Sequence, residues 1–389
     1  MKKCLTIIAC IIPLLISIKI VAAECNRVWL NDNKVGAASS IEQFEQLFAE
    51  DKLSYNTIAQ RMKLFRVPGA SLAYVKGGHV FWAKSYGVTQ VGTGQCVEVD
   101  TIFSAASISK VATSVMTLLL TQQKKLSLDT DVNAYLKSWQ VPSNGNSQTN
   151  PVTLRRIMSH TAGLNVHGFR DFQPNEALPN TVQILKGQPP AKNPPIRLIY
   201  QPGKVYSYSG GGTTVMQLVI EDVMHTSFEQ ASHRLLFQPL DMTNSSFATP
   251  TESLHTKVAK AHDRFGRATA LPRGWESMPE KAASGLWTSA YDLGLMLAEL
   301  LESYHTKANV LLAPKVIKDM MTAEENSKHG LGPIIDGEAF YHSGANDSYR
   351  AYFYGNLATS NGFVILTNSA SADSFIDEVQ DAMNKMGKY

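Results

Sequence analysis

Several features that would assign a chain to common protein classes are missing from this 389-residue sequence. It contains no run of lysine and arginine and no basic strip interleaved with aromatic residues, so nucleic acid is not an expected partner. It contains neither His-Glu-x-x-His nor Gly-x-Ser-x-Gly, which argues against a metallohydrolase and a Ser-His-Asp hydrolase. Internal repeats and low-complexity tracts are also lacking. Hydrophobic residues make up 44% and charged residues 18%, a composition typical of a folded core rather than of disorder.

The N-terminus has the pattern of a secretory signal peptide. Two lysines are followed by an apolar stretch from about Leu5 to Ile18, and small residues precede Glu24. We expect residues 1–23 to be removed, giving a periplasmic or secreted protein without stable membrane insertion. The alternative is an uncleaved membrane anchor, although the apolar run is shorter than the roughly 20 residues of a spanning helix. Removing 1–23 deletes three lysines and no acidic residue, so the formal charge falls from +3 to zero.

Cysteine is scarce: only two of the four in the chain, Cys25 and Cys96, lie outside the predicted signal peptide. In an oxidising compartment the simplest prediction is a disulfide between them. The alternatives are two free thiols or a metal site, and two isolated cysteines lack the spacing of zinc ligands.

Periodicity predicts strands near both ends of the chain. Two short apolar runs joined by Gly77-Gly78 indicate a β-hairpin, and three strand-like runs near the C-terminus precede an amphipathic helix. A connection at about 168–203 has the length of a loop that lines a site. The expected elements are a helix at 41–63, strands at 68–75 and 79–83, a helix at 104–122 with Val111, Val115, Leu118 and Leu119 in the core, strands at 339–343, 348–354 and 362–367, and a helix at 373–386.

Strands at both ends with helices between them predict one sheet completed by distant segments. We expect an α/β (α+β) fold, with a mainly antiparallel sheet flanked by helices and an inserted, mainly helical region. The expected division is an α/β domain at 24–126 and 274–389, an inserted region at 127–273, and a site between the two.

Ser107 and Lys110 form the first candidate motif, within the helix predicted at 104–122. Residues three apart on a helix share a face, with Cβ atoms roughly 5 to 6 Å apart, so the amine can reach the hydroxyl. Serine is a weak nucleophile that needs a neighbouring base, and burial can lower an amine's pKa enough for this role. A helix N-terminus also favours negative charge on the attacked oxygen. Alone, Ser-x-x-Lys is common on solvated helix faces.

Two further motifs are weak when taken singly. Tyr208-Ser209-Gly210 begins a glycine run, and a tyrosine can act as a general acid or base. Residues 342–344, His-Ser-Gly, end a predicted strand where a backbone N–H just beyond the glycine can stabilise an oxyanion. A buried structural tyrosine and a structural histidine are the ordinary alternatives.

In this order the three motifs resemble the serine β-lactamase and penicillin-binding-protein superfamily. They are most similar to its branch of class C β-lactamases, D-aminopeptidases, D-alanyl-D-alanine carboxypeptidases and related esterases. Supporting resemblances lie at 154–164, which includes Ser-His-Thr-Ala-Gly-Leu, at 283–293 and at 366–369. The resemblance covers roughly residues 55 to 385 and implies a β-lactamase/transpeptidase-like fold.

The resemblance implies a role for each residue of the three motifs. Ser107 would be the acylated nucleophile, Lys110 its proton acceptor or electrostatic activator, and Tyr208 a proton relay to the leaving group and to water. The oxyanion hole would use the N–H groups of Ser107 and Ala345. The remaining substrate-binding positions would be Gly210, His342, Ser343 and Gly344. This chemistry needs no cofactor and no metal.

Two departures from the family pattern affect the expected substrate. Gly210 stands where many members have the asparagine of Tyr-x-Asn, and His342 replaces the lysine of Lys-Thr-Gly. A lysine there binds substrate carboxylates, whereas histidine has an unperturbed pKa near 6.5. Arg350 is the candidate replacement for that charge.

The resulting hypothesis is a secreted serine hydrolase that acts on an amide, ester or lactam carbonyl of a small molecule or peptide, such as one derived from the cell wall. The lost lysine favours a peptidase or esterase over an efficient β-lactamase. The alternative is a non-catalytic homologue that binds penicillin or cell-wall peptides.

Overall fold

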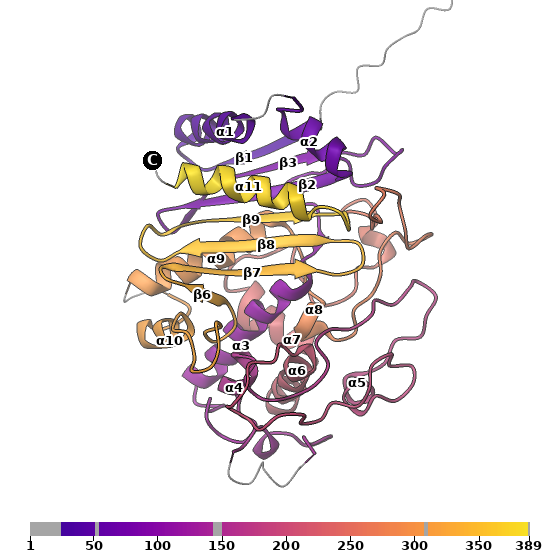
Figure 1. Ribbon diagram of the computed structural model, residues 1–389, viewed down its shortest axis with the longest axis vertical. Helices are drawn as coiled ribbons and strands as arrows, with labels where there is room; N and C mark the ends of the chain where they lie inside the picture. Colours follow the sequence, from indigo (N-terminus) through magenta and orange to yellow (C-terminus); the bar gives the residue numbers. More distant parts are fainter. Residues whose placement is uncertain (1–24, 51–53, 143–149, 307–309, 388–389) are drawn as a thin grey trace, which may run out of the picture.

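The computed structural model describes residues 25–50, 54–142, 150–306 and 310–387 (Figure 1). The signal peptide expected at 1–23 lies outside the described residues. Within the described parts, no helix has the length and apolarity needed to cross a bilayer.

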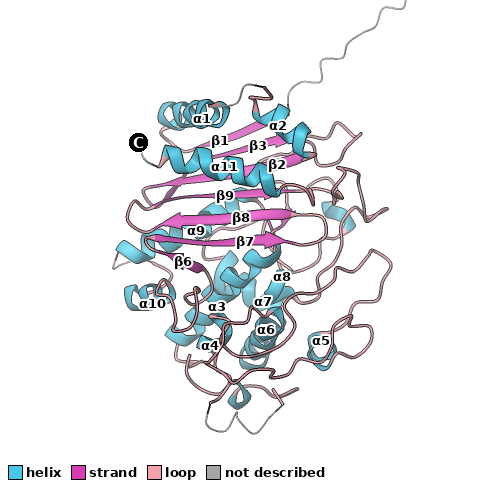
Figure 2. Ribbon diagram, viewed as in Figure 1, coloured by secondary structure: helices cyan, strands magenta, loops and turns pink. Residues whose placement is uncertain are grey.

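A seven-stranded antiparallel sheet joins the two ends of the chain (Figure 2). Its strand order is β1-β3-β2-β9-β8-β7-β6, so strand β2 from the N-terminal hairpin pairs with β9 from the C-terminal segment. This confirms the mainly antiparallel sheet completed by distant segments. The strands are β1 (Asn26–Leu30), β2 (Gly69–Lys76), β3 (His79–Gly87), β6 (Ile334–Asp336), β7 (Ala339–Ala345), β8 (Arg350–Asn356) and β9 (Asn361–Thr367). A separate two-stranded pair consists of β4 (Phe103–Ser104) and β5 (Trp287–Thr288).

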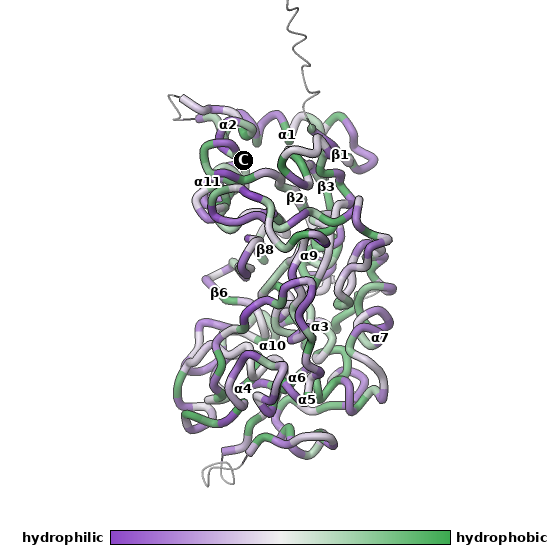
Figure 3. Tube along the Cα trace, turned by 90° about the vertical axis from the view of Figure 1, so that its right-hand side faces the viewer, coloured by the Kyte–Doolittle hydropathy of each residue, from purple (hydrophilic) through white to green (hydrophobic). Residues whose placement is uncertain are grey.

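Helices cover both faces of the sheet. On one face α1 (Lys34–Ala49), α2 (Ile58–Phe65) and α11 (Asp373–Met386) bury an apolar layer that includes Trp82 and Phe375. On the other face α9 (Ala290–His305) packs against the central strands, and the larger apolar core continues into the helical half. Figure 3, the side view, places α11 and α9 on opposite sides of β8.

The helical half lies beyond the β6 edge of the sheet (Figure 1). Its central helix α3 (Ser109–Gln122) is buried on nearly every side and contains the four predicted core residues, all of them buried. The other elements are η1 (Ala106–Ile108), η2 (Val132–Ala134), α4 (Leu154–Met158), α5 (Thr181–Lys186), α6 (Gly210–Met224), α7 (Phe228–Ser232), η3 (His233–Phe237), η4 (Glu252–Leu254), α8 (Lys281–Ser284) and α10 (Pro314–Met320).

Two predicted helix boundaries were wrong. The helix expected at 41–63 is two helices, because a capping box on Thr57 and Gln60 starts α2 separately from α1. The helix expected at 104–122 begins later: Phe103 and Ser104 pair with β5, and a 3₁₀ turn at 106–108 precedes α3. The closing helix at 373–386 was predicted correctly.

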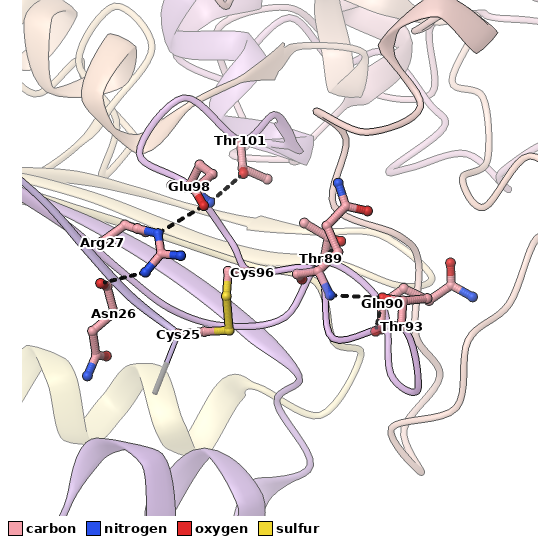
Figure 4. Close-up of a disulfide and its surroundings, with 10 residues drawn as sticks. Cys25, Asn26, Arg27, Thr89, Gln90, Thr93, Cys96, Glu98 and Thr101 are labelled. Atoms are coloured by element: carbon pink, nitrogen blue, oxygen red, sulfur yellow. Dashed lines mark hydrogen bonds and ion pairs between the residues drawn. A yellow bond between two sulfur atoms is a disulfide. The ribbon is translucent and has the colours of Figure 1, made fainter. Parts of the chain in front are cut away.

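Cys25 and Cys96 form the expected disulfide (Figure 4). It joins the residue before β1 to the segment that follows β3. Arg27 and Glu98, each two residues after one of the cysteines, form an ion pair at 3.0 Å across the same connection. The bond therefore ties edge strand β1 to the body of the sheet.

Candidate active site

Ser107 lies on the single turn η1 between strand β4 and helix α3. Ala106, the preceding residue, has a φ of 45°, which is unusual for a residue with a Cβ atom and strains the backbone beside the serine. The buried Ser109 holds this turn in place. Its hydroxyl donates to the Ala106 carbonyl at 2.5 Å and accepts from the Leu286 N–H at 2.9 Å. The turn is thus fixed against the segment that follows α8.

Lys110 is buried one turn further along, with its amine directed at Ser107. Its Nζ lies 3.2 Å from Ser107 Oγ and donates to the Ala283 carbonyl at 2.7 Å. The second hydrogen bond aligns the long side chain, so the contact predicted from the spacing of three residues is present in the folded chain.

Tyr208 precedes helix α6, whose N-cap is Ser209. The Ser209 hydroxyl accepts the Gly212 N–H at 2.8 Å and donates to the Asn165 carbonyl at 2.7 Å, which fixes the approach to the helix. The Tyr208 ring centroid then lies 5.0 Å from Lys110 Nζ. The tyrosine that precedes α6 and the lysine of α3 are thereby brought together.

The third motif lies at the end of β7, which packs directly against η1. A Cβ atom on Gly344 would come 2.3 Å from the Ala105 carbonyl oxygen, so only glycine permits this approach. The approach brings the strand end that carries Ala345 alongside the turn that carries Ser107.

These residues surround one cavity of about 570 Å³. Gly210 also lines it, and a Cβ atom there would lie 3.0 Å from the Phe169 ring and 3.2 Å from the His167 carbonyl. The asparagine side chain of the family pattern would therefore crowd the 167–169 loop at this position. The sequence-predicted residues that line the cavity are Ser107, Lys110, Tyr208, Gly210, His342, Ser343 and Ala345.

His342 is a neutral hydrogen-bonding group in this cavity. Its Nδ1 lies 2.7 Å from the Ser343 carbonyl, which can only accept, so Nδ1 carries the proton and Nε2 is left with a lone pair. Nε2 is buried and has no hydrogen-bond partner among the described residues. Burial, together with Lys110 and His329, lowers the pKa of His342 to about 3. At neutral pH this position therefore supplies an acceptor where the family has a cation.

Two more buried histidines, His160 and His329, lie near the Tyr208 ring. The ring centroids of His160 and Tyr208 lie 4.2 Å apart, and His160 Nδ1 accepts the Ser209 N–H at 3.2 Å. His329 Nδ1 donates to the Gly332 carbonyl at 2.8 Å, which leaves Nε2 to accept from the Tyr206 hydroxyl at 3.3 Å. Burial lowers the pKa of His160 well below the ordinary value and that of His329 to about 4. Both rings are neutral packing partners at physiological pH.

Asp171 is the acidic side chain among the described residues that line the cavity. It is 6% exposed, and burial with the nearby Asp347, Glu276 and Glu280 raises its pKa well above the ordinary value. Burial also raises the pKa of Glu280 to about 7, although Lys110 opposes this shift. The raised pKa favours the neutral, protonated form of the Asp171 side chain in this cavity.

The expectation that Arg350 supplies the missing cation was wrong. Its guanidinium donates to the backbone carbonyls of Asn346 and Tyr349 at 2.5 and 2.9 Å and pairs with Asp373 at 3.2 Å. It is not among the residues that line the cavity. Strand β8 directs this side chain towards the start of α11 instead.

Several residues that line the cavity or lie next to its lining received no role from the sequence. His160 was visible as part of the Ser-His-Thr segment, and Tyr206 lies two residues before Tyr208. His329 and Asp171 gave no local signal, because they come from loops that meet the site only through the fold. Among the described residues, no group of three or more His, Cys, Asp or Glu side chains could hold a metal ion.

Comparison with known proteins decides the family. The family model described as Beta-lactamase matches residues 56–382. The chain belongs to the β-lactamase family. Membership confirms the resemblance drawn from the three motifs.

The similar curated relatives are distant. Protein flp of Staphylococcus aureus is 24% identical over 309 residues, which cover 78% of this chain and 60% of the relative. The chain thus spans about three fifths of the length of that relative.

Solved structures of the β-lactamase family share the fold. The octameric penicillin-binding protein homologue from Pyrococcus abyssi has a TM-score of 0.69 and 24% identity, covering 84% of this chain and 76% of its own. EstCE1, a hydrolase with promiscuous acyltransferase activity, has a TM-score of 0.68 and 20% identity, covering 90% of this chain and 99% of its own. The D-alanine carboxypeptidase AmpC from Burkholderia cenocepacia has a TM-score of 0.66 and 20% identity, covering 91% and 100%. At these identities the likeness concerns the fold.

Proposed function

We propose that the protein is a secreted or periplasmic serine hydrolase that cleaves an amide or ester through an acyl-enzyme on Ser107. The observation that carries this proposal is the 3.2 Å contact between Lys110 Nζ and Ser107 Oγ inside a cavity open to a substrate. A serine and a buried amine in hydrogen-bond reach are the nucleophile and base of this chemistry.

In the proposed acylation, Ser107 Oγ forms a bond to the substrate carbonyl carbon and its proton passes to Lys110. The N–H groups of Ser107 and Ala345 stabilise the resulting oxyanion. The carbonyl re-forms as the bond to the leaving group breaks, and Tyr208 delivers the proton to that group. Water then attacks the acyl ester with help from Tyr208, and Ser107 recovers its proton.

The proposed substrate is a small ester or a peptide, such as one derived from the cell wall, rather than a β-lactam. Two observations support this choice: His342 is neutral, and Arg350 is engaged with Asp373. The third motif therefore offers no fixed cation to hold a lactam carboxylate, although Lys328, outside the motif, also lines the cavity. The structural neighbours include a carboxypeptidase, a promiscuous hydrolase and a class C β-lactamase, so they do not decide between these substrates.

The second candidate is a non-catalytic protein that binds penicillin or cell-wall peptides. It is favoured by the altered second and third motifs and by the penicillin-binding protein homologue among the structural neighbours. In both candidates a covalent probe would acylate Ser107, but only the first candidate releases the acyl group and turns over.

The test uses the purified chain from residue 24 onward with a fluorophosphonate probe and a fluorescent penicillin. We expect covalent labelling that Ser107→Ala abolishes and that exposed Ser374→Ala, on α11, leaves intact. A panel of p-nitrophenyl esters, D-amino-acid peptides and nitrocefin then ranks the substrates. Stable labelling without turnover selects the second candidate, and no labelling of the folded protein rejects both.

A further inference from the structure

A second cavity lies on the opposite face of the sheet from Ser107. It has a volume of about 610 Å³ and is lined by strands β7, β8 and β9 and by the C-terminal end of α11. In Figure 1 helix α11 lies in front of the upper strands, whereas β8 and β7 have no helix in front of them. The sheet is therefore left partly uncovered at the strands next to the active site.

The uncovered strands carry a row of aromatic side chains. The strand register pairs Tyr341 with Tyr354, Tyr354 with Phe363 and Phe363 with Tyr74. Tyr352 lies two residues before Tyr354 and points to the same face. We call the cavity formed over these five residues the aromatic groove.

The rings of the aromatic groove have similar orientations. Tyr341 and Tyr352 have centroids 5.9 Å apart at an interplanar angle of 30°, and Tyr352 and Phe363 are 5.9 Å apart at 33°. Tyr354 and Phe363 are 5.2 Å apart at 27°. Tyr341, Tyr352 and Tyr354 are half-buried, whereas Tyr74 and Phe363 are buried. The three half-buried tyrosines combine apolar rings with phenol groups that are available to a ligand.

The rim of the groove is polar and nearly uncharged. Asn356, the last residue of β8, accepts from Thr359 in the turn between β8 and β9, and Asn361, the first residue of β9, accepts the Gly77 N–H from the turn between β2 and β3. Asp336 is the one charged side chain among the described residues that line the groove. None of the described residues that line the groove is a lysine or an arginine, so this lining does not suit phosphate, nucleic acid or anionic lipid. A purely apolar ligand would leave the phenols and amides without partners.

We propose that the aromatic groove binds a neutral oligosaccharide. The C–H faces of six-membered sugar rings pack on aromatic rings, and their hydroxyls hydrogen-bond to phenols, amides and a carboxylate. A row of similarly oriented rings fits successive sugars of a linear chain better than a single compact ligand. Tyr341 is adjacent to His342, so a bound glycan would lie across the strand that forms one wall of the catalytic cavity.

The test measures binding by calorimetry with neutral hexasaccharides, chitohexaose and cellohexaose, on the full chain from residue 24. We expect one of them to bind, Tyr354→Ala and Tyr352→Ala each to weaken binding at least tenfold, and exposed Tyr55→Ala to have no effect. Thermal unfolding of each variant checks the fold. Tyr354→Phe keeps the ring and removes its hydroxyl, and this variant should retain most of the affinity.

Three outcomes would overturn the proposal. They are no binding of either hexasaccharide at millimolar concentration, binding that the tyrosine variants leave unchanged, and tighter, salt-sensitive binding of a heparin hexasaccharide. A change of oligomeric state in the tyrosine variants, without glycan binding, would instead identify the groove as an interface between copies. Ser107→Ala should bind the glycan normally, so failure of the hydrolase proposal and failure of this one are distinguishable.

Discussion

Gly344 packs directly against Ala105 in the candidate active site, since a Cβ atom on Gly344 would stand 2.3 Å from the Ala105 carbonyl oxygen. This contact sets the separation between β7 and the turn that carries Ser107. In the proposed mechanism the two oxyanion donors, the N–H groups of Ser107 and Ala345, come from these two segments. The oxyanion hole therefore depends on a residue that takes no part in the chemistry.

Gly344→Ala should separate the strand from the turn and misplace one donor. Loss of an oxyanion donor reduces rate by about 10² to 10³, so the acylation rate with the fluorophosphonate probe should fall by that factor. Gly387→Ala is the matched control, because its added Cβ would meet atoms only at 3.7 Å or more. Unchanged acylation by a folded Gly344→Ala protein would contradict this geometry.

Lys110→Ala should remove the base from Ser107 and lower the acylation rate by about 10² to 10⁴. The substitution leaves a small cavity and one unpaired carbonyl at Ala283, so the variant should remain folded by circular dichroism. Exposed Lys318→Ala, on α10, controls for loss of a lysine charge. Hydrolysis of a p-nitrophenyl ester at the wild-type rate by Lys110→Ala would remove this residue from the mechanism.

The Cys25–Cys96 disulfide should stabilise the fold without affecting chemistry. It closes a loop with a sequence separation of 71, for which chain entropy predicts a loss of about 4 kcal/mol when the bond is removed. Double replacement by serine should lower the free energy of unfolding in urea, and reduction of the wild type should reproduce the effect. Equal stability of the oxidised and reduced wild type would show that β1 is held by its strand pairing alone.

His342 should not titrate in the catalytic pH range. Because its pKa is lowered to about 3, the side chain is neutral from pH 5 to 8, and the pH profile of kcat/KM should contain no step from this residue. His342→Gln, which is also neutral, should therefore leave the shape of the profile unchanged. A step near pH 6.5 that disappears in His342→Gln would show that the histidine is charged during turnover.

His342→Lys should shift selectivity towards substrates that carry a carboxylate. A hydrogen bond to a charged group contributes about 1.5–3 kcal/mol, so acylation by nitrocefin relative to a neutral p-nitrophenyl ester should rise at least tenfold. His342→Gln provides the neutral comparison. An unchanged ratio would mean that carboxylate binding in this cavity does not depend on the third motif.

The sequence predicted the parts of the site that depend on local spacing. Ser107 and Lys110 are three residues apart, and their contact needs only one turn of helix. The charge state of His342 could not be predicted in this way, because it results from burial by segments distant in the sequence, including the loop that carries His329. The direction of the Arg350 side chain could not be predicted for the same reason. It depends on backbone carbonyls and on Asp373, which become neighbours of Arg350 only after folding.

Asp171 should make the stability of the protein depend on pH in an identifiable direction. Its pKa is raised in the folded state, chiefly by burial and then by Asp347, Glu276 and Glu280, so the folded chain retains a proton that the unfolded chain has lost. The stabilising effect of this proton is complete below the unfolded pKa near 4 and is lost as pH rises through the folded value. Asp171→Asn keeps an acceptor for the Asp347 N–H and stays neutral at every pH.

We therefore expect Asp171→Asn to have a higher Tm than the wild type at pH 8, with the difference shrinking towards zero near pH 4. Exposed Asp381→Asn, on α11, is the control and should track the wild type across this range. A difference that grows as the pH falls would mean that the Asp171 carboxylate is stabilised as an anion in the fold, and that this wall of the cavity can hold a permanent negative charge.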